Sequence, residues 1–427
     1  MPSAAYENDV GTTTSATARQ KATAATSSAG EKETLSADIP VFDISIESVE
    51  LGKKLVEGVS KWGFLWIIAS PPPSDQYNDS SSTTTTTSST DETKAKGTYD
   101  IDEETVNKVF EISREFFQEA PLKEKEACRV NAKDNKGWVD MQIENLDPQN
   151  QKRGDFKQAF NLMEKVDGNW QKLMPDTFKK SNNEIILQTF HSQCRNLTYR
   201  ILRLLALGLD LPDVNWLVKS HERSPFTSRL LYYPKLPPDT DYNPAEDIRA
   251  SSHSDYGTIT HLFQRPGQGG LQILTPDGIW ANVPVFPSNY HHSNNFPPVL
   301  VNIADLLSYW TNGLLKSTIH RVVIPDASEL ETTAAGAGVG LGEDRFSIAI
   351  FTQPTRDTEI VPMPSSIVMD RAAQFSRETV GHGGGTNNNN NNNNISGPAG
   401  GQRILTAGEY LEQRLKATYE SVHGKQT

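Results

Sequence analysis

Three residues of this sequence carry side chains that could together bind a metal ion. His253 and Asp255 lie two residues apart, and His320 precedes the apolar run Val322-Val-Ile. In a β-strand, residues two apart point to the same face, so we expect His253 and Asp255 to reach one ion, with His320 supplying an imidazole from a facing strand. Two imidazoles and one carboxylate leave three coordination positions open, an arrangement used for iron(II) that must bind both a co-substrate and O₂.

An isolated His-x-Asp pair is weak evidence, because such a pair occurs by chance in many proteins of this size. Taken alone, it more often consists of two polar residues at a surface or in a turn. The other histidines favour structural interpretations: His191 and His221 lie in helical or loop sequence, His261 in a strand, and His291-His292 in a loop rich in Asn and Pro. The metal hypothesis therefore depends on the residues around the pair.

A second pair of polar residues, Arg345 and Ser347, lies in an otherwise apolar segment. An arginine that faces a core needs a partner, and its guanidinium suits a carboxylate, to which Ser347 can add a hydrogen bond. A dicarboxylic acid that binds iron at one end and Arg345 at the other would satisfy both sites. Other interpretations stay open: Arg345 could be exposed on an edge strand or paired with Asp344, and Tyr233, which could bind the same carboxylate, could be a core or rim tyrosine.

The first half of the chain is expected to be mixed, with helices dominating. Apolar residues at helical spacing predict helices near residues 49–62, 103–119 and 184–207, and short apolar runs predict strands at 39–44 and 64–68.

After Pro225 the pattern changes to short strands separated by Gly, Pro and Asn turns, which predicts a sandwich or a closed double sheet. A last helix is expected at 406–422, where it packs back on the core and helps to close a pocket. The strands are expected at 229–233, 259–264, 270–275, 279–283, 299–303, 320–324 and 345–352.

Four low-complexity segments lack the apolar side chains that would offset the entropy of ordering. We expect a disordered tail at 1–38 and surface insertions at 71–97, 327–342 and 381–401. The Asn tract of the last segment could mediate aggregation or interaction, although a tolerated loop expansion is the simpler interpretation.

Composition restricts the class of partner. The chain has 427 residues, a net charge of -12, and no run of basic residues interleaved with aromatics, which argues against a nucleic-acid partner. It has only Cys128 and Cys194, and no apolar segment long enough for a signal peptide or a bilayer span. We therefore expect a soluble cytoplasmic protein without a membrane partner; its oligomeric state is open.

The stretch from Arg229 to Pro354 resembles the iron(II)- and 2-oxoglutarate-dependent dioxygenase superfamily of the isopenicillin N synthase type. Ile39-Pro-Val-Phe-Asp, Trp62-Gly-Phe-Leu and Phe116-Phe ahead of Pro121 resemble the N-terminal domain of that family, so the resemblance covers about three quarters of the chain. The segments that carry it in the second half, in the expected order, are Arg229-Leu-Leu-Tyr-Tyr-Pro, His253-Ser-Asp-Tyr-Gly-Thr-Ile-Thr, Gly269-Gly-Leu-Gln-Ile, Val301-Asn-Ile-Ala-Asp-Leu-Leu-Ser-Tyr-Trp-Thr-Asn-Gly and Leu315-Lys-Ser-Thr-Ile-His-Arg-Val.

The resemblance implies an α+β, mainly β fold. Its core would be a double-stranded β-helix, or jelly roll, at 225–356, preceded by a helix-rich region at 39–220 and followed by an extension at 357–427 that ends in a helix.

The resemblance also implies roles for the residues singled out above. His253, Asp255 and His320 would be the catalytic iron ligands, and Arg345 and Ser347 would hold the far carboxylate of 2-oxoglutarate. The implied reaction hydroxylates, desaturates or cyclises a small metabolite, such as one of secondary metabolism, while O₂ is consumed and 2-oxoglutarate yields succinate and CO₂. Ascorbate is a candidate reductant.

Tyr233 matches the second tyrosine of the family's motif, which assists in holding 2-oxoglutarate. The sequence departs from the family at two positions. Leu231 stands where many members have Asn, which could alter how 2-oxoglutarate or the tyrosine is held. Ser254 stands where plant members usually have Thr, and it is expected to point away from the metal.

Two competing functions remain at this point. One is an iron(II) oxidase of the same fold that uses no 2-oxoglutarate, as isopenicillin N synthase and aminocyclopropanecarboxylate oxidase do; release of CO₂ from labelled 2-oxoglutarate separates the two. The other is a non-catalytic jelly roll that acts as a binding module, which failure to bind iron(II) would favour.

Overall fold

The computed structural model describes residues 35–70, 99–130, 135–147, 151, 153–170, 172–237, 239–243, 247–288, 290, 296–325, 342–371 and 405–414. Residues Leu35–Thr427 form one compact unit. The expected insertions at 71–97 and 381–401, and 327–342 except for its last residue, lie outside the described residues.

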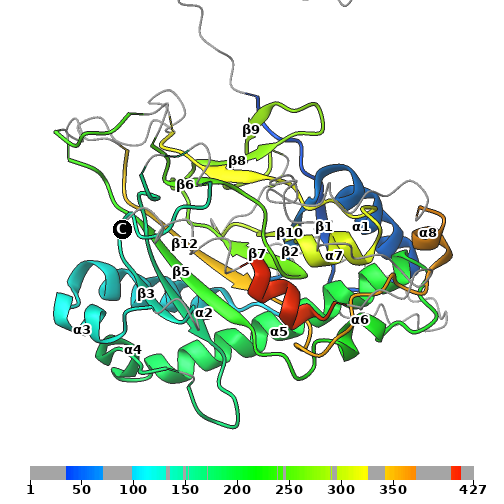
Figure 1. Ribbon diagram of the computed structural model, residues 1–427, viewed down its shortest axis with the longest axis horizontal. Helices are drawn as coiled ribbons and strands as arrows, with labels where there is room; N and C mark the ends of the chain where they lie inside the picture. Colours follow the sequence, from blue (N-terminus) through cyan, green and yellow to red (C-terminus); the bar gives the residue numbers. More distant parts are fainter. Residues whose placement is uncertain are drawn as a thin grey trace, which may run out of the picture. The chain divides into compact units, whose positions relative to one another are not determined.

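The fold is mixed α/β and contains two β-sheets, one lying over the other in Figure 1. All strand pairs are antiparallel except β1 with β2. The larger sheet has the order β1 (Val41–Asp43), β2 (Phe64–Ile68), β10 (Val299–Ile303), β7 (Ile259–Phe263), β12 (Arg345–Phe351), β5 (Thr227–Tyr233), β4 (Gln158–Met163) and β3 (Gly137–Val139). The smaller sheet has the order β6 (Ala250–His253), β11 (His320–Val322), β8 (Leu271–Leu274) and β9 (Trp280–Asn282).

Helices cover the outer face of the larger sheet. The 26-residue α5 (Asn183–Gly208) packs closely on α1 (Val49–Trp62), where a Cβ at Gly52 would lie 2.4 Å from the carbonyl oxygen of Leu204. The remaining helices are α2 (Glu103–Arg114), the π-helical η2 (Glu115–Glu119), α3 (Leu122–Ala127), α4 (Asp176–Lys179), α6 (Trp216–Lys219), α7 (Asp305–Trp310), α8 (Ser366–Met369) and a helix at 407–414.

Strand alternation divides the apolar residues between two cores. Leu230 and Ile348 point toward the helices and belong to the larger core, whereas Leu231 and Ala349, one position further along, belong to the core between the sheets. This is the period-two alternation of a sheet that is buried on both faces. The residues that could do chemistry are on the face between the sheets.

The expected helices and strands lie within a few residues of the predicted positions, with three differences. The helix at 103–119 changes to a π-helical turn at Glu115. Strands β3 and β4 and the short helices α3, α4, α6, α7 and α8 were not predicted. Of the expected disordered tail at 1–38, residues 1–34 lie outside the described residues, and the prediction was wrong for its end, because the backbones of Leu35 and Ala37 hydrogen-bond to that of Asn282 at 2.8 Å. Among the described residues, no helix is both long and apolar enough to cross a membrane.

Candidate metal centre and the cavity around it

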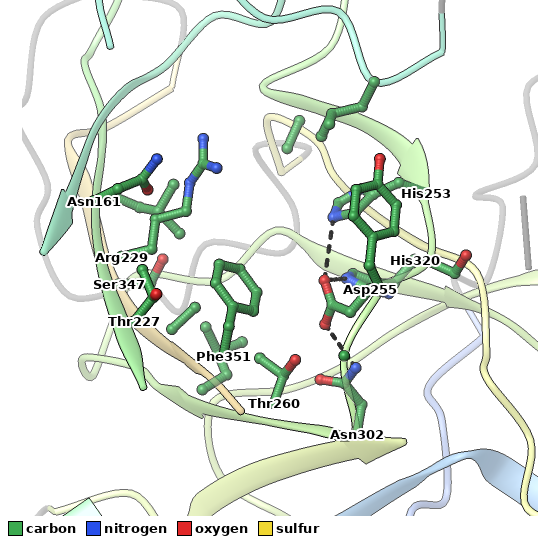
Figure 2. A pocket seen from close by; sticks show the side chains of 18 of the residues that line it. Asn161, Thr227, Arg229, His253, Asp255, Thr260, Asn302, His320, Ser347 and Phe351 are labelled. Carbon is green, nitrogen blue, oxygen red and sulfur yellow. Dashed lines mark hydrogen bonds and ion pairs between the residues drawn. The ribbon is translucent and has the colours of Figure 1, made fainter. Parts of the chain in front are cut away.

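His253, Asp255 and His320 converge at one end of the smaller sheet (Figure 2). His253 of β6 and His320 of β11 are directly opposite each other in the antiparallel pair. The Nε2 atom of each histidine lies 4.0 Å from Asp255 Oδ1. Their potential ligand atoms all lie within 4.8 Å of one another, so one ion could contact all three.

One step of the prediction from strand spacing was wrong. β6 ends at His253, so Asp255 does not continue that strand and the alternation of side chains does not place it. Asp255 is instead placed by the turn that follows β6. This turn is held by a hydrogen bond in which the backbone N–H of Asp305 donates to the carbonyl oxygen of Asp255 at 2.9 Å. Ser254, between the two ligands, is buried and donates its hydroxyl to Asp305 Oδ2 at 3.2 Å.

Backbone carbonyls orient both imidazoles. Nδ1 of His253 lies 2.6 Å from the carbonyl oxygen of Ser251, and Nδ1 of His320 lies 3.1 Å from that of Thr318. Because a carbonyl oxygen can only accept, Nδ1 carries the proton in each ring and Nε2 keeps its lone pair for a metal. Burial, followed by the neighbouring His320, holds the pKa of His253 well below its usual range.

Asn302 holds the carboxylate of Asp255 and was not predicted as a functional residue. Its Nδ2 donates to Asp255 Oδ2 at 2.8 Å, and Thr260, opposite it on β7, hydrogen-bonds the same carboxyl group. Burial acts to raise the pKa of Asp255, but the two histidines and these hydrogen bonds outweigh it and lower the pKa. A signal was present in the sequence, since Asn302 is the one polar residue of Val299–Ile303.

These three candidate metal ligands, called the metal-ligand group below, line a cavity of about 230 Å³ between the sheets. Every second residue of β5 and of β12 contributes to its wall, as the alternation of strand side chains requires. These residues include Asn161 and Met163 of β4, Thr227, Arg229, Leu231 and Tyr233 of β5, and Arg345, Ser347, Ala349 and Phe351 of β12.

Arg345 is a buried cation inside this cavity. It is 2% exposed, its Nη1 donates to Ser347 Oγ at 3.1 Å, and its guanidinium lies 4.9 Å from the ring of Tyr233. β12 runs between β5 and β7, so Arg345 is not on an edge strand. Asp344 does not neutralise it but accepts hydrogen bonds from the hydroxyl of Tyr232 and the backbone of Lys235.

The residues that line this cavity fit both iron(II) and 2-oxoglutarate, the two groups that the sequence resemblance implied. Two neutral imidazoles and a carboxylate suit iron(II). No acidic side chain among the described residues forms an ion pair with Arg345, and a second buried arginine, Arg249, is close enough to interact with its charge. Burial, and then the charge of Arg345, lower the pKa of Arg249 to about 10. A carboxylate from a bound dicarboxylic acid would offset this positive charge.

The other histidines in the described part of the chain have structural roles. His191 lies 2.5 Å from Ser228 Oγ, and the Nε2 atoms of His221 and His261 lie 2.8 Å from threonine hydroxyls. All three are buried and outside the metal-ligand group, as expected from the sequence. His291 and His292 lie outside the described residues.

Comparisons with known proteins agree with this geometry. Residues 226–354 match the family model of the 2OG-Fe(II) oxygenase superfamily, and residues 97–181 match that of the non-haem dioxygenase in morphine synthesis N-terminal. A UPF0676 protein of Schizosaccharomyces pombe is 33% identical over 60% of this chain and 72% of its own. A 2-oxoglutarate-dependent dioxygenase of Aspergillus rugulosus is 27% identical over 64% of this chain and 80% of its own.

The fold is also similar to that of solved structures. A full-length Neurospora crassa protein, crystallised with alpha-KG and thymine, has a TM-score of 0.62 and 23% identity; the match covers 91% of this chain and 98% of that protein. The candidate metal ligands and the buried arginine lie in the part of the chain that matches the first family model. The chain therefore belongs to the 2-oxoglutarate-Fe(II) oxygenase superfamily and is an iron(II)- and 2-oxoglutarate-dependent dioxygenase.

Proposed function

We propose that His253, Asp255 and His320 bind the iron(II) of this dioxygenase, and that Arg345 and Ser347 bind the far carboxylate of 2-oxoglutarate. Tyr233, which packs against the guanidinium, assists them. The observation that carries this assignment is that the three candidate metal ligands and a fully buried guanidinium line the same cavity. A dicarboxylic acid in that cavity is the ligand that would interact with both.

The chain's own residues prepare the centre for chemistry. With O₂ and 2-oxoglutarate, bound iron(II) supplies an oxidant that removes hydrogen from a substrate C–H bond, with release of succinate and CO₂. Asn302 fixes one oxygen of Asp255, and the carbonyls of Ser251 and Thr318 fix the two rings, so the ligands do not need to reorganise. Phe64, Leu231 and other apolar side chains in the wall limit the access of water to the reacting groups.

We propose that residues 225–356 form the catalytic domain and that its strands, which lie in two sheets, make up a double-stranded β-helix; the two sheets around one cavity support this. Eight of the twelve strands in the described part of the chain, β5 to β12, lie in this range. Residues 39–220 contribute β1 to β4 and the helices that cover the larger sheet. Residues 357–427 contribute a helix whose Leu411 lines the cavity.

The size of the cavity supports a small substrate. Pockets for drug-sized ligands have volumes of roughly 300–1,000 Å³, whereas this one has about 230 Å³ and must also hold 2-oxoglutarate. The similar proteins include one named proline hydroxylase, from Petromyces alliaceus, and the Neurospora protein that was crystallised with thymine. We therefore propose a small metabolite, of secondary metabolism, as the substrate.

Anaerobic titration of the full-length protein with iron(II) and 2-oxoglutarate tests this assignment. We expect the visible charge-transfer band of the chelate in the wild type, and Arg345→Ala to require far more 2-oxoglutarate to form it. Arg321→Ala is the matched control, because Arg321 stacks on Trp280 and lies outside the cavity wall. Iron binding without a band would indicate the 2-oxoglutarate-independent oxidase, and failure to bind iron would contradict the metal assignment.

A further inference from the structure

The cavity has a second polar wall whose residues the proposed iron and 2-oxoglutarate sites do not use. In the register of the larger sheet, Asn161 of β4 is opposite Arg229 of β5, which is opposite Ala349 of β12. Phe351 lies two residues further along β12 and is opposite Thr227. Four residues of strand separate Phe351 from Ser347, or about 13 Å at the usual rise per residue, which leaves space for a second ligand.

The amide of Asn161 presents an unused acceptor. Its Nδ2 donates to both the backbone oxygen and the side-chain oxygen of Asn135, at 3.0 and 2.9 Å. These two acceptors fix the orientation of the amide, because the reversed amide would place its oxygen against the carbonyl of Asn135. Asn161 is 2% exposed and its Oδ1 has no hydrogen-bond partner. A buried acceptor of this kind is costly unless a ligand supplies a donor.

The charges of this wall are already balanced. Arg229 pairs with Glu144, whose Oε2 lies 3.3 Å from Lys157 Nζ, and Lys157 also pairs with Asp155. The side chains of Glu144 and Lys157 are 3% and 4% exposed. Two positive and two negative groups therefore cancel one another. A charged ligand would lose its hydration on binding here and would find no counter-ion to compensate. The wall favours a neutral ligand.

Phe351 adds a flat apolar surface. Figure 2 shows its ring in the cavity, between the metal-ligand side and the side chains of Asn161 and Arg229. A planar ligand could stack on this ring while its edge reaches the polar wall. The small volume of the cavity restricts such a ligand to about one ring.

We propose that Asn161, Arg229 and Phe351 recognise the substrate, and that the substrate is a neutral, flat cyclic imide. The imide N–H donates to Asn161 Oδ1, the adjacent carbonyl accepts from Arg229, and the ring stacks on Phe351. The opposite edge of the ring then carries the C–H group that is oxidised. This inference rests on the proposed function, because that places the iron at His253, Asp255 and His320.

Three isomeric probes test the imide without any mutation. Thymine and 1-methyluracil keep the N–H between the two carbonyls. In 3-methyluracil, which is an isomer of both, this nitrogen carries the methyl group instead of the hydrogen. Binding to the full-length protein with iron(II) and 2-oxoglutarate, without O₂, is measured by calorimetry. We expect 3-methyluracil to bind at least about tenfold more weakly than its isomers, because Asn161 Oδ1 stays unpartnered. Equal binding of all three, or no binding of any, would overturn the proposal.

Benzoate tests the preference for a neutral ring. It has a similar flat shape but carries a charge, so we expect it to bind at least about tenfold more weakly than thymine; tighter binding would show that the wall recognises a carboxylate. In Asn161→Ala we expect the discrimination among the isomers to disappear, while Asn282→Ala, outside the cavity, keeps it. If Asn161→Ala does not fold, the three isomers decide on the wild type alone.

The failure of this inference is distinct from that of the proposed function. Calorimetry of the probes does not depend on the charge-transfer band. If the charge-transfer band forms and the three isomers bind equally, the proposal of an imide substrate is wrong and the assignment of the 2-oxoglutarate site holds. If the protein discriminates among the isomers and no charge-transfer band forms, the assignment of the substrate wall holds and that of the 2-oxoglutarate site fails.

Discussion

Arg414 Nη2 lies 3.0 Å from Asp305 Oδ2, and this contact joins the C-terminal helix to the turn that carries Asp255. Asp305 is fully buried and also accepts hydrogen bonds from Ser254 and Ser317, so one carboxylate connects the turn between His253 and Asp255 to the segment that precedes His320. The guanidinium of Arg414 also lies 4.5 Å from the ring of Tyr256. The helix at 407–414 thus packs back on the core, as expected from the sequence.

Arg414→Met is expected to destabilise the protein by about 3 kcal/mol, because it leaves the buried carboxylate of Asp305 without its cation. We also expect a higher KM, since Leu411 of the same helix lines the cavity. Chemical denaturation and steady-state kinetics measure the two effects. Arg356→Gln is the control: it removes an exposed ion pair to Glu412 of the same helix and should cost under about 1 kcal/mol. Equal effects of the two variants would contradict this role for Asp305.

Asn302→Ala is expected to weaken iron(II) binding by roughly 10- to 100-fold, because Asp255 loses the donor that fixes one of its oxygens. The measurement is an anaerobic iron(II) titration, with circular dichroism to confirm folding. Asn282→Ala, a change of the same kind on β9 and outside the cavity, should leave the affinity unchanged. A normal affinity in folded Asn302→Ala would show that the hydrogen bond is dispensable.

Gly257→Ala is expected to displace the turn that carries Asp255. An added Cβ would lie 2.2 Å from the carbonyl oxygen of Thr352, which also accepts from the backbone of Thr258. We expect a loss of stability of about 1–3 kcal/mol and weaker iron(II) binding, both measured by titration. Gly269→Ala, where a Cβ would meet nothing within 4 Å, should have little effect on either. If both variants behave like the wild type, the turn tolerates a shift.

Protonation of Glu144 is expected to lower the stability of the protein in acid. Burial acts to raise its pKa, but Arg229 and Lys157 outweigh burial and lower it from 4.5 to about 2. The stabilisation is therefore complete above about pH 4.5 and is lost as the pH falls toward 2; at about 1.4 kcal/mol per pKa unit it amounts to about 3 kcal/mol.

Denaturation midpoints between pH 3 and 7 measure this dependence. Glu144→Gln should be less stable at neutral pH and should lose less stability on acidification than the wild type. Glu50→Gln removes an exposed carboxylate that is paired with Lys54 and should retain the wild-type slope. An unchanged slope in Glu144→Gln would assign the acid sensitivity to other groups.

The sequence predicted that His253, Asp255 and His320 lie together, because all three are chemically distinctive residues within strand-like segments. The reason given for Asp255 was wrong, since the carboxylate is placed by a backbone hydrogen bond from Asp305, fifty residues later in the chain. Contacts at that separation have no local signal. Arg345 and Ser347 were predicted as neighbours on one strand face, and they are hydrogen-bonded to each other.

The substrate wall was missed for a different reason. Asn161 belongs to β4, which the sequence pattern did not predict, and only the pairing of β4 with β5 places Asn161 beside Arg229. The charges of Glu144 and Lys157 are likewise unremarkable in the sequence and become informative only through their burial. Pairing between distant strands is set by tertiary packing, so no local periodicity could identify this wall.

A single strand contributes to both ligand sites of the cavity. Arg345 and Ser347 at one end of β12 face the proposed 2-oxoglutarate site, and Ala349 and Phe351 at the other end face the proposed substrate wall. Because the rise of a β-strand is fixed, the spacing between co-substrate and substrate is built into the backbone. Laboratory evolution could therefore exchange residues 349 and 351 to select new substrates and leave the residues of the proposed iron and 2-oxoglutarate sites in place.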